Sequence, residues 1–417
     1  MLGYNRAMSV PMRSAETHPH INYRLDLRRL AAPTWVLLGE AKSKAQHVGR
    51  ALLSPKAAEE LLQVYLVKGM LATTAIEGNT LSEDEVRRIL DRTLELPPSR
   101  EYLEKEIENV LAAYNTAKGE LLKTPDLPFT VERLCEYNRL ILDGLELEED
   151  VVPGEIRRHS VVVGSYRAAP AEDARVLLED LCDWLNGDEF NPPPDAPELA
   201  ASLAIVKAIV AHLYLAWIHP FGDGNGRTAR LLELQILLCA GFPVPTCQLL
   251  SNHYNLTRSE YYRQLALSSR EGTGVFSFLR YAVRGFVDQL REQLEVIRQV
   301  QFEDRWEQFV YQTFGEPRSE SQHRRLRLVL DVSHAYQRSS EPVPKRAITD
   351  LTPRLAAAYA SKTEKTLSRD LNAIRDLGLL RPVVGGWVPA DEAIQRLLPE
   401  SADGVLWDRV TPSASSA

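Results

Sequence analysis

Apolar residues recur at helical spacing along most of the chain. The spacing predicts helices over residues 57–72, 82–96, 100–122, 131–142, 173–185, 199–218, 231–240 and 275–301. Residues 199–218 are almost continuously apolar, which is typical of a helix that is buried all round. Gly241 follows the next apolar run and can end that helix in a left-handed conformation. The pattern therefore predicts a mainly helical protein.

Two parts of the chain depart from this pattern. Residues 154–166 form a run rich in β-branched residues with a Gly-Ser turn, which predicts a short hairpin. The composition changes beyond residues 314–317, which we take as a domain boundary. Two helices are expected there, over 347–360 and 362–377, followed by a small hairpin over 379–388. A helix-turn-helix with a hairpin wing is typical of a winged helix.

The expected fold class is mainly α, with a small β-hairpin beside a helical core and a C-terminal winged helix. Met1 to Ile21 are expected to be a flexible extension. The expected divisions are 1–40 for the N-terminal extension, 41–125 for a helical region before the core, 126–300 for the core, 318–400 for the winged helix and 401–417 for a flexible tail. A length of 417 residues is enough for two or three domains.

The composition is that of a globular protein, with 44% hydrophobic and 25% charged residues and a net charge of −8. We expect that no apolar run reaches the length needed to cross a membrane, and no signal-peptide pattern opens the chain. The four cysteines lack metal-ligand spacing and lie mostly in apolar helical stretches. They are therefore expected to be reduced core residues of a cytoplasmic protein.

The densest candidate chemistry lies in twelve residues between the two most apolar helices, His219-Pro-Phe-Gly-Asp-Gly-Asn-Gly-Arg-Thr-Ala-Arg230. The loop leads into a helix, whose first N–H groups and positive dipole end attract anions. Gly224 and Gly226 let the backbone approach a phosphate without a Cβ in the way. Their amides and the Asn225 side chain can donate hydrogen bonds to a phosphate during reaction. The segment therefore predicts a nucleotide site.

The other residue types divide the chemistry of such a site among them. His219 suits a general base, because its ordinary pKa lies near neutrality. Asp223 offers one hard oxygen ligand to Mg²⁺, which bridges phosphates and keeps most of its waters. Arg227 and Arg230 lie three apart on one helix face, and each can donate paired hydrogen bonds to phosphate oxygens.

This segment resembles the signature of Fic-domain proteins, His-Pro-Phe-x-Asp/Glu-Gly-Asn-Gly-Arg-x-x-Arg, and matches it at every specified position. Members with the intact signature typically transfer AMP from ATP to a Ser, Thr or Tyr hydroxyl of a target protein and release pyrophosphate. The resemblance implies that His219 is the base and that Asp223 binds Mg²⁺. It implies that Arg227 contacts the β-phosphate and Arg230 the γ-phosphate. The implied nucleotide-binding residues of the loop are Gly224, Asn225, Gly226, Arg227, Thr228, Ala229 and Arg230.

A second motif lies far upstream, at Thr73-Thr-Ala-Ile-Glu-Gly-Asn79. It resembles the family's autoinhibitory signature, Ser/Thr-x-x-x-Glu-Gly/Asn, with Thr73, Glu77 and Gly78 in the matching places. The resemblance implies that Glu77 reaches the nucleotide site and pairs with Arg230, which removes the charge meant for the γ-phosphate. The alternative is that Glu77 is a solvated surface residue.

Two further regions resemble parts of the family's site more loosely. The hairpin expected over 154–166 stands where the family has a flap that pairs with the target by strand addition; an ordinary hairpin without a partner is the alternative. The candidate docking residues are Val161, Val162, Val163 and Gly164. Three other residues lie where relatives have side chains near the adenine, and core packing is an equal alternative for the two tyrosines. These are His253, Tyr261 and Tyr262.

The C-terminal region is locally basic. From residue 320 to 381 it has twelve Lys or Arg against seven Asp or Glu, in a chain whose overall charge is negative. A basic winged helix fits DNA, but such modules also dock proteins or dimerise. The expected partners are therefore ATP with Mg²⁺ and a target protein. DNA binding and a homodimer remain open alternatives, and no membrane partner is expected.

The function expected from the resemblance is a self-inhibited protein adenylyltransferase. Three alternatives remain: removal of AMP by the same site, transfer of another phosphate-containing group, and a transcriptional regulator that only senses nucleotide. Arg227 and Arg230 favour a full triphosphate as ligand. The presence of His219, which sensing would not need, counts against the regulator.

Overall fold

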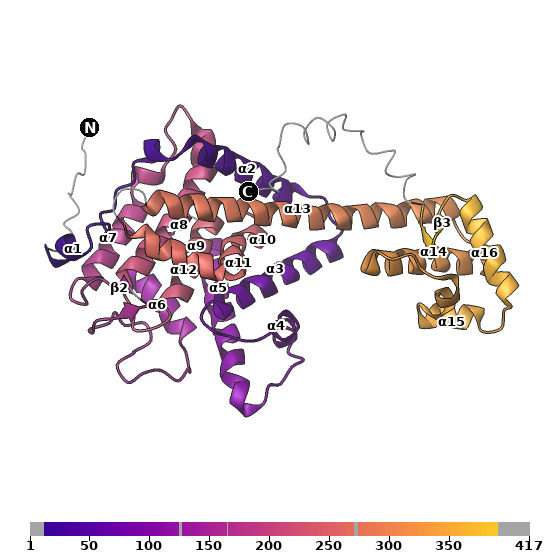
Figure 1. Ribbon diagram of the computed structural model, residues 1–417, viewed down its shortest axis with the longest axis horizontal. Coiled ribbons are helices and arrows are strands. Elements are labelled where there is room, and N and C mark those ends of the chain that lie inside the picture. Colours follow the sequence, from indigo (N-terminus) through magenta and orange to yellow (C-terminus); the bar gives the residue numbers. More distant parts are fainter. Residues whose placement is uncertain (1–11, 125–126, 165, 271–273, 391–417) are drawn as a thin grey trace. The chain divides into compact units, whose positions relative to one another are not determined.

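A computed structural model of the 417-residue chain describes residues 12–124, 127–164, 166–270 and 274–390 (Figure 1). The mainly helical fold expected from the sequence is confirmed. The chain divides into two compact units, residues 1–297 and 298–417. Each unit has a hydrophobic core of its own, so each is described by itself.

The division falls inside α13 (Gly274–Phe314), whose 41 residues exceed the helix expected over 275–301. The expected end of the core at residue 300 lies close to this division, but the expected boundary at 314–317 is wrong. Trp306 and Val310 already belong to the core of the second unit. Helical periodicity continues across the division, and the sequence pattern therefore gives no sign of it.

The first unit consists of helices and one small hairpin. Its helices are α1 (Met12–Thr17), α2 (Ala32–Arg50), α3 (Pro55–Ala75), α4 (Glu83–Leu90), α5 (Glu101–Lys123), α6 (Val131–Ile141), α7 (Ala174–Asn186), α8 (Ala200–Ile218), α9 (Asn225–Cys239), α10 (Val244–Cys247), α11 (Leu249–Leu256), α12 (Arg258–Ser268) and the first part of α13. Short 3-10 turns lie at Leu27–Arg29, Pro98–Arg100, Asp188–Phe190 and Pro197–Leu199. The antiparallel hairpin pairs β1 (Val162–Val163) with β2 (Tyr166–Arg167).

The helices α8 and α9 lie in the middle of this unit (Figure 1) and pack against each other. Most side chains of both are buried, as their apolar sequences predict. Gly241, with φ 78°, ends α9, and the N–H of Phe242 donates to the carbonyl of Leu237 at 3.1 Å. The predicted stop is therefore confirmed, since this is a Schellman-type ending.

One expectation about α8 is wrong. Among the described residues, the stretch Pro197–Ile218 is long and apolar enough to cross a membrane by length and composition. In the most apolar part of this stretch, 72% is buried inside the protein. A core helix would be buried in the same way.

The flexible extension expected over Met1 to Ile21 is wrong for its described part, where Ser14, His18 and Ile21 are buried. Within the described part, Ile21, Tyr23, Leu25 and Leu30 are buried in the core of the first unit. The hydroxyl of Tyr23 donates to the carbonyl of Leu177 at 2.5 Å. Ile21, Tyr23 and Leu25 recur at intervals of two over a short irregular stretch, which is why no helical pattern reveals them.

The helix α2 is absent from the sequence-based prediction, and α4 is shorter than predicted. The buried face of α2 includes Ala41 and Ala45, which contrast little with the exposed positions. Ser82 and Glu85 form a capping box that starts α4. The helix ends at Leu90 rather than at residue 96, and Arg92 then turns the chain with φ 55°.

The described part of the second unit contains the end of α13 and six further elements. They are α14 (Glu320–Ser339), η5 (Lys345–Asp350), α15 (Pro353–Tyr359), α16 (Glu364–Asp376) and the antiparallel hairpin of β3 (Leu380–Val383) with β4 (Gly386–Pro389). The helix expected over 347–360 is split, because Thr352 caps a new helix whose first residue is Pro353. Helices followed by a hairpin are the order expected of a winged helix, and that assignment stays a prediction. The tail expected over 401–417 lies outside the described residues.

Candidate functional site

His219 is the residue at which α8 ends, as the sequence predicts. Its backbone is left-handed, with φ 50° and ψ 60°, and this turns the chain from the helix into the loop. Such a conformation is uncommon for a residue with a side chain and needs support from its surroundings. Arg157 supports this conformation with two hydrogen bonds. Its Nε donates to the carbonyl of His219 at 2.6 Å, and its backbone N–H donates to the carbonyl of Pro220 at 2.9 Å. Sequence reasoning assigned Arg157 no such part.

The imidazole of His219 is uncharged at neutral pH. Burial lowers its pKa to about 4, and the positive charge of Arg157 acts in the same direction. A hydrogen bond with the backbone of Ala216 and the charges of Glu77 and Asp223 only partly oppose this shift. An uncharged ring can accept a proton, which is the state that a general base requires.

The loop after His219 is closed by the side chain of Asn225. Its Oδ1 accepts from the N–H of Phe221 at 2.9 Å, and its Nδ2 donates to the carbonyl of Phe221 at 2.8 Å. Both of its polar atoms thus shape the loop, and because Nδ2 carries a second hydrogen, donation to a phosphate stays a prediction. What remains for an anion is the start of α9, where Gly224 provides no side-chain cap and the first N–H groups have no helical partner.

Two glycines of the loop, Gly224 and Gly226, are required by their surroundings. Gly224 has φ 74°, and a Cβ there would lie 2.9 Å from Nδ2 of Asn138. Asn138, fully buried on α6, donates to the carbonyl of Asp223 at 2.8 Å and accepts from the N–H of Gly154 at 3.0 Å. At Gly226 a Cβ would collide with Oε1 of Glu77. One glycine thus permits the turn, and the other leaves room for a group beside the helix start.

Asp223 is the exposed carboxylate of the loop. About half of its side chain, 49%, is accessible, and Oδ1 accepts from the N–H of Gly224 at 2.5 Å. Among the described residues, no group of three or more His, Cys, Asp or Glu could hold a metal ion. A single accessible carboxylate fits an Mg²⁺ that arrives with a triphosphate and takes its other ligands from phosphates and water.

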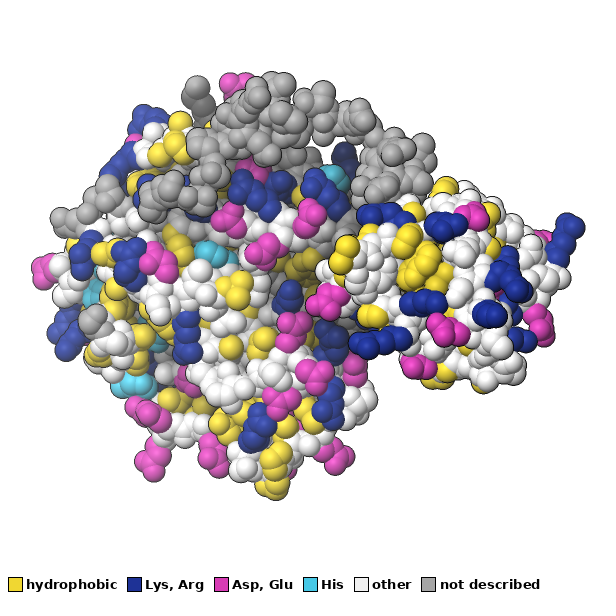
Figure 2. Space-filling view, turned by 45° about the vertical axis from the view of Figure 1, so that its right-hand side comes forward, with side chains coloured by type: hydrophobic (Ala, Val, Ile, Leu, Met, Phe, Trp, Pro, Cys, Tyr) yellow, Lys and Arg dark blue, Asp and Glu magenta, His cyan; other side chains and the backbone are white. Residues whose placement is uncertain are grey.

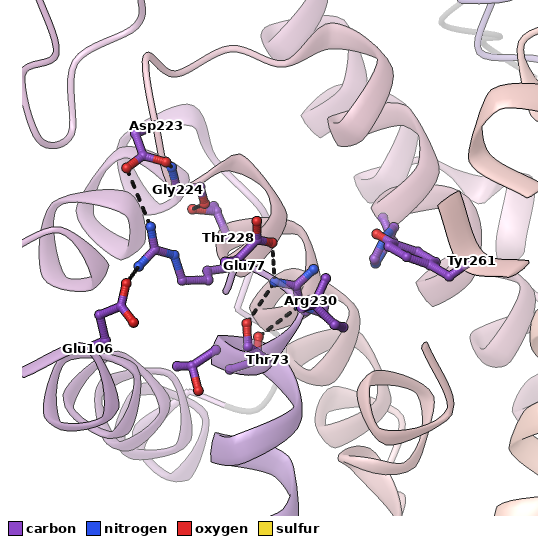
Figure 3. A network of polar contacts seen from close by, with 12 residues as sticks. Thr73, Glu77, Glu106, Asp223, Gly224, Thr228, Arg230 and Tyr261 are labelled. Atoms are coloured by element: carbon purple, nitrogen blue, oxygen red, sulfur yellow. Dashed lines mark hydrogen bonds and ion pairs between the residues drawn. The ribbon is translucent and has the colours of Figure 1, made fainter. Parts of the chain in front are cut away.

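Arg230 is buried, with 2% of its surface exposed, and contacts the segment formed by residues 73–79 (Figure 3). Nε donates to Oγ1 of Thr73 at 2.8 Å, and Nη2 donates to the Thr73 carbonyl at 2.9 Å. Nη2 also donates to Oε1 of Glu77 at 2.6 Å. The predicted contact of Glu77 with Arg230 is confirmed, although 153 residues separate the two in sequence.

Both partners of this pair are charged. Burial alone would raise the pKa of Glu77, but the charge and hydrogen bond of Arg230 hold it below its ordinary value. Burial would lower the pKa of Arg230, and the charge of Glu77 raises it on balance. Nη1 of Arg230 is buried and has no hydrogen-bond partner. This atom would lie 3.1 Å from a Cβ at position 226, so a bare donor faces the loop.

Arg227 has a separate set of partners. Nη1 donates to Oε1 of Glu106 at 3.1 Å, and Nη2 lies 3.5 Å from Oδ2 of Asp223. Sequence reasoning missed Glu106, because a single Glu in the run 101–108, where four occur, carries no distinguishing signal. The two arginines therefore lie in different carboxylate environments.

Four other predicted nucleotide residues have different surroundings from those expected. Oγ1 of Thr228 donates to the carbonyl of Gly224 at 2.9 Å, and Ala229 is fully buried, so both side chains face the core. The ring of His253 packs against Tyr281 and Gly285 of α13, which favours a packing role. Tyr261 is 3% exposed and hydrogen-bonds His212, as a core residue does.

Tyr262 remains the one of the three adenine candidates that is exposed, at 41%. Its hydroxyl donates to the carbonyl of Ile76 at 3.2 Å, so it contacts the 73–79 segment. A place beside the adenine stays a prediction for this residue.

The predicted hairpin exists but is short. β1 and β2 pair over two residues each, and the N–H of Ala168 donates to the carbonyl of Val161 at 3.1 Å. Val162 and Val163 are exposed, at 56% and 42%, and Gly164 turns the chain with φ 57°. Residues 154–160, expected to be part of the hairpin, contain no strand; Ile156 bridges Phe221 instead. Docking of a target by this hairpin stays a prediction.

Residues 128–237, which include this loop, match the profile of the Fic/DOC family. The chain carries a Fic domain. The matched range begins before α6 and ends in α9, so it contains His219 and both arginines but not the 73–79 segment. That segment reaches the Fic domain only through folding of the chain.

Curated relatives of this Fic domain share it over part of their length. The chain is 34% identical over 197 residues to "Protein adenylyltransferase fic-1" of Caenorhabditis briggsae, which covers 47% of this chain and 35% of the relative. It is 28% identical over 273 residues to "Protein adenylyltransferase Fic" of Aedes aegypti, covering 64% of this chain and 47% of the relative. The chain thus spans between a third and a half of the length of these relatives.

Solved structures resemble the fold. Fic-1 from Caenorhabditis elegans has a TM-score of 0.51 and 26% identity, and the match covers 64% of this chain and 73% of that one. A Fic family protein from Desulfovibrio desulfuricans G20 has a TM-score of 0.50 and 20% identity, covering 84% of this chain and 91% of that one. At that identity the second likeness concerns the fold alone.

Proposed function

We propose that this Fic domain is a protein adenylyltransferase, which moves AMP from ATP to a hydroxyl side chain of a target protein. The observation that carries the proposal is the loop from His219 to Arg230. It combines an uncharged, half-buried imidazole with a helix start and two buried arginines. The relatives named as protein adenylyltransferases support the same reaction.

In the proposed reaction Nε2 or Nδ1 of His219 takes the proton of the target hydroxyl as its oxygen attacks the α-phosphorus of ATP. The bond from the α-phosphorus to the bridging oxygen breaks, and pyrophosphate leaves with the electron pair. The N–H groups at the start of α9 donate to the phosphate oxygens, whose charge grows in the transition state. Arg227 and Arg230 hold the β- and γ-phosphates. Asp223 would hold the Mg²⁺ that offsets the phosphate charge.

We further propose that Glu77 inhibits this reaction. Its carboxylate occupies Nη2 of Arg230 at 2.6 Å, the donor that the γ-phosphate would need. While Glu77 is in place, the γ-phosphate of a bound nucleotide lacks Nη2 of Arg230 as a donor. To reach it, the nucleotide would have to break the hydrogen bond between Arg230 and Glu77, which is worth about 1.5–3 kcal/mol. Withdrawal of the 73–79 segment would therefore activate the site.

For the target, we propose that a segment adds as a strand beside β1. In the described part of the chain, β1 pairs with β2 alone, and the side chains of Val162 and Val163 are exposed. An unpaired strand edge with exposed apolar side chains is suited to strand addition.

Two labelled nucleotides test the reaction itself. The Glu77→Gly variant is incubated with Mg²⁺ and ATP that has the label either at the α- or at the γ-phosphate. Transfer of AMP predicts label on protein from the α-position only, together with pyrophosphate. Label from the γ-position would instead indicate transfer of a phosphoryl group and overturn the proposal.

A second function, binding of duplex DNA, is proposed for the second unit. α16 buries Leu367, Leu371 and Ile374 and leaves its basic residues exposed. On the face of this unit seen in Figure 2, several basic side chains are scattered among acidic, hydrophobic and other side chains. The exposed basic residues on and just before α16 are Lys362, Lys365, Arg369 and Arg375.

This proposal is tested by the anisotropy of labelled duplex DNA with the full chain. Exchange of both Lys365 and Arg369 for Glu should abolish binding, while Arg338→Glu on α14 serves as the matched control. Wild-type binding should weaken steeply with salt, because phosphate contacts release counterions. Equal binding by both variants would exclude α16 as the DNA-contacting helix.

A further inference from the structure

Arg227 is held by a carboxylate that the proposed reaction does not use. Glu106, on α5, accepts from Nη1 of Arg227 at 3.1 Å (Figure 3). The two side chains are 17% and 6% exposed. On the other side of the guanidinium, Nη2 lies 3.5 Å from Asp223, while Nε is buried without a hydrogen-bond partner.

The same carboxylate also contacts the 73–79 segment. Nδ2 of Asn79 donates to Oε2 of Glu106 at 2.8 Å and to the carbonyl of Leu103 at 3.0 Å. Asn79 is buried and lies two residues after Glu77. The segment therefore reaches both arginines: Glu77 contacts Arg230 directly, and Asn79 reaches Arg227 through Glu106.

This arrangement fixes the orientation of Arg227. Its two terminal nitrogens are engaged from opposite sides, and each oxygen of Glu106 has one partner. A long side chain that is oriented before its ligand arrives loses less freedom when the ligand binds. The remaining buried Nε–H is a donor that a phosphate oxygen can satisfy, and leaving it unpaired is unfavourable.

We propose that Glu106 is a positioning residue, which holds Arg227 in the orientation that binds the nucleotide phosphates and is itself held by Asn79. This inference rests on the proposed function of the loop. It predicts that Glu106 acts on nucleotide affinity through Arg227. It also predicts that a change at Asn79 acts on Arg227 although the two residues do not touch.

The test is Glu106→Gln in the Glu77→Gly background. The amide has the shape of the carboxylate but only one acceptor oxygen, so it cannot accept from both Arg227 and Asn79. The KM for ATP·Mg²⁺ should rise about tenfold while kcat stays within about twofold, which is the pattern of lost uniform binding. Glu108→Gln, an exposed position on the same helix, is the matched control and should change neither constant.

Asn79→Asp is the second variant. It keeps the oxygen that accepts from Leu81 N–H at 3.0 Å but replaces the donor to Glu106 by a like charge. The KM for ATP·Mg²⁺ should again rise severalfold, because repulsion displaces the carboxylate that orients Arg227. This variant answers the question if Glu106→Gln does not fold, which circular dichroism would reveal.

The proposal would be overturned if the KM for ATP·Mg²⁺ were unchanged or lower in both variants. It would also be overturned if both variants lost kcat and kcat/KM by the same factor, because KM would then be unchanged. Binding of a fluorescent ATP analogue with Mg²⁺ separates this outcome from failure of the proposed function. If no protein is labelled but the analogue binds about tenfold more weakly to Glu106→Gln, Glu106 positions Arg227 and the reaction assignment fails. If AMP transfer occurs and the analogue binds both proteins alike, the reaction stands and this inference fails.

Discussion

The carboxylate of Glu77 lies beside Gly226, where a larger residue would not fit. A Cβ at position 226 would collide with the Glu77 carboxylate, so the glycine that exposes helix N–H groups to a phosphate also admits the carboxylate. The resemblance to the family signature led to both residues from the sequence. It could not lead to Glu106, Asn138 or Arg157, because each is one polar residue among many until folding places it beside the loop.

The lowered pKa of His219 gives a prediction for the pH dependence of transfer. With its pKa at about 4, the imidazole is already uncharged at pH 6, whereas a histidine of ordinary pKa, 6.5, would be mostly protonated. We expect kcat/KM for the acceptor, measured with Glu77→Gly, to stay flat between about pH 8 and 6. A loss with a midpoint near 6.5 would contradict the buried, uncharged base.

Arg157 gives a prediction for stability. Its guanidinium donates to four carbonyls, those of Ile218, His219, His159 and Ala169. Arg157→Lys keeps the charge but leaves buried acceptors unpaired, which should lower the free energy of unfolding by about 2–3 kcal/mol. Thermal unfolding measures this, with Arg158→Lys as the exposed control. An unchanged Tm would mean that other groups support the loop.

At the scale of elements, helices with strong contrast between apolar and polar positions were predictable. The ends of α5, α6, α7, α8 and α9 lie within a few residues of their predicted ends except for the start of α9. α9 begins at Asn225, inside the motif, because its first turn consists of Gly226, Arg227 and Thr228 rather than apolar residues. The sequence of α2 shows little contrast between apolar and polar positions, because alanines line its buried face. The continuation of α13 beyond residue 301 was not predicted either.

The end of α3 is attached to α12 by one hydrogen bond, from Tyr262 to the carbonyl of Ile76. Tyr262→Phe removes this bond and should loosen the 73–79 segment. In the otherwise wild-type chain we expect transfer to rise about two- to fivefold, as the loss of one net hydrogen bond of about 1 kcal/mol allows. Tyr281→Phe, whose hydroxyl contacts Thr257, is the matched control. Reduced transfer would indicate instead that Tyr262 serves the nucleotide, as its predicted place beside the adenine implies.

At the scale of the whole molecule, the family match covers residues 128–237, while the site draws on elements outside it. Glu77 follows α3, and Glu106 lies on α5. Local motifs predicted the chemistry of the loop, but which carboxylate meets which arginine depends on packing between helices. The second unit forms a separate core.

Three half-buried histidines predict how the stability of the protein depends on pH. Burial lowers the pKa of His20, His219 and His253 to about 4 each, and His18 adds to the effect at His20. Between pH 6.5 and 4 the unfolded chain therefore binds more protons at these sites than the folded one. The free energy of unfolding should fall on acidification, by up to about 1.4 kcal/mol per pH unit for a fully buried histidine.

One group acts in the opposite direction: burial raises the pKa of Asp180 to about 6, so the folded state holds that proton first. On acidification, the three histidines together lower the free energy of unfolding by more than this one carboxyl raises it. Tm should therefore fall steadily from pH 7 to 4.5, and His20→Gln should flatten the decline. A Tm that is constant or rises over this range would contradict the burial of these side chains.

The central claim is that the loop transfers AMP and that Glu77 restrains it. The most direct measurement is the intact mass of wild type, Glu77→Gly and Glu77→Gly/His219→Ala after incubation with ATP·Mg²⁺ and a cell lysate, with the lysate proteins read by peptide mass spectrometry. We expect an AMP adduct that is weak in wild type, strong in the single variant and absent in the double variant. An adduct that persists without His219 would contradict the base assignment, and equal labelling by wild type and Glu77→Gly would contradict the inhibition.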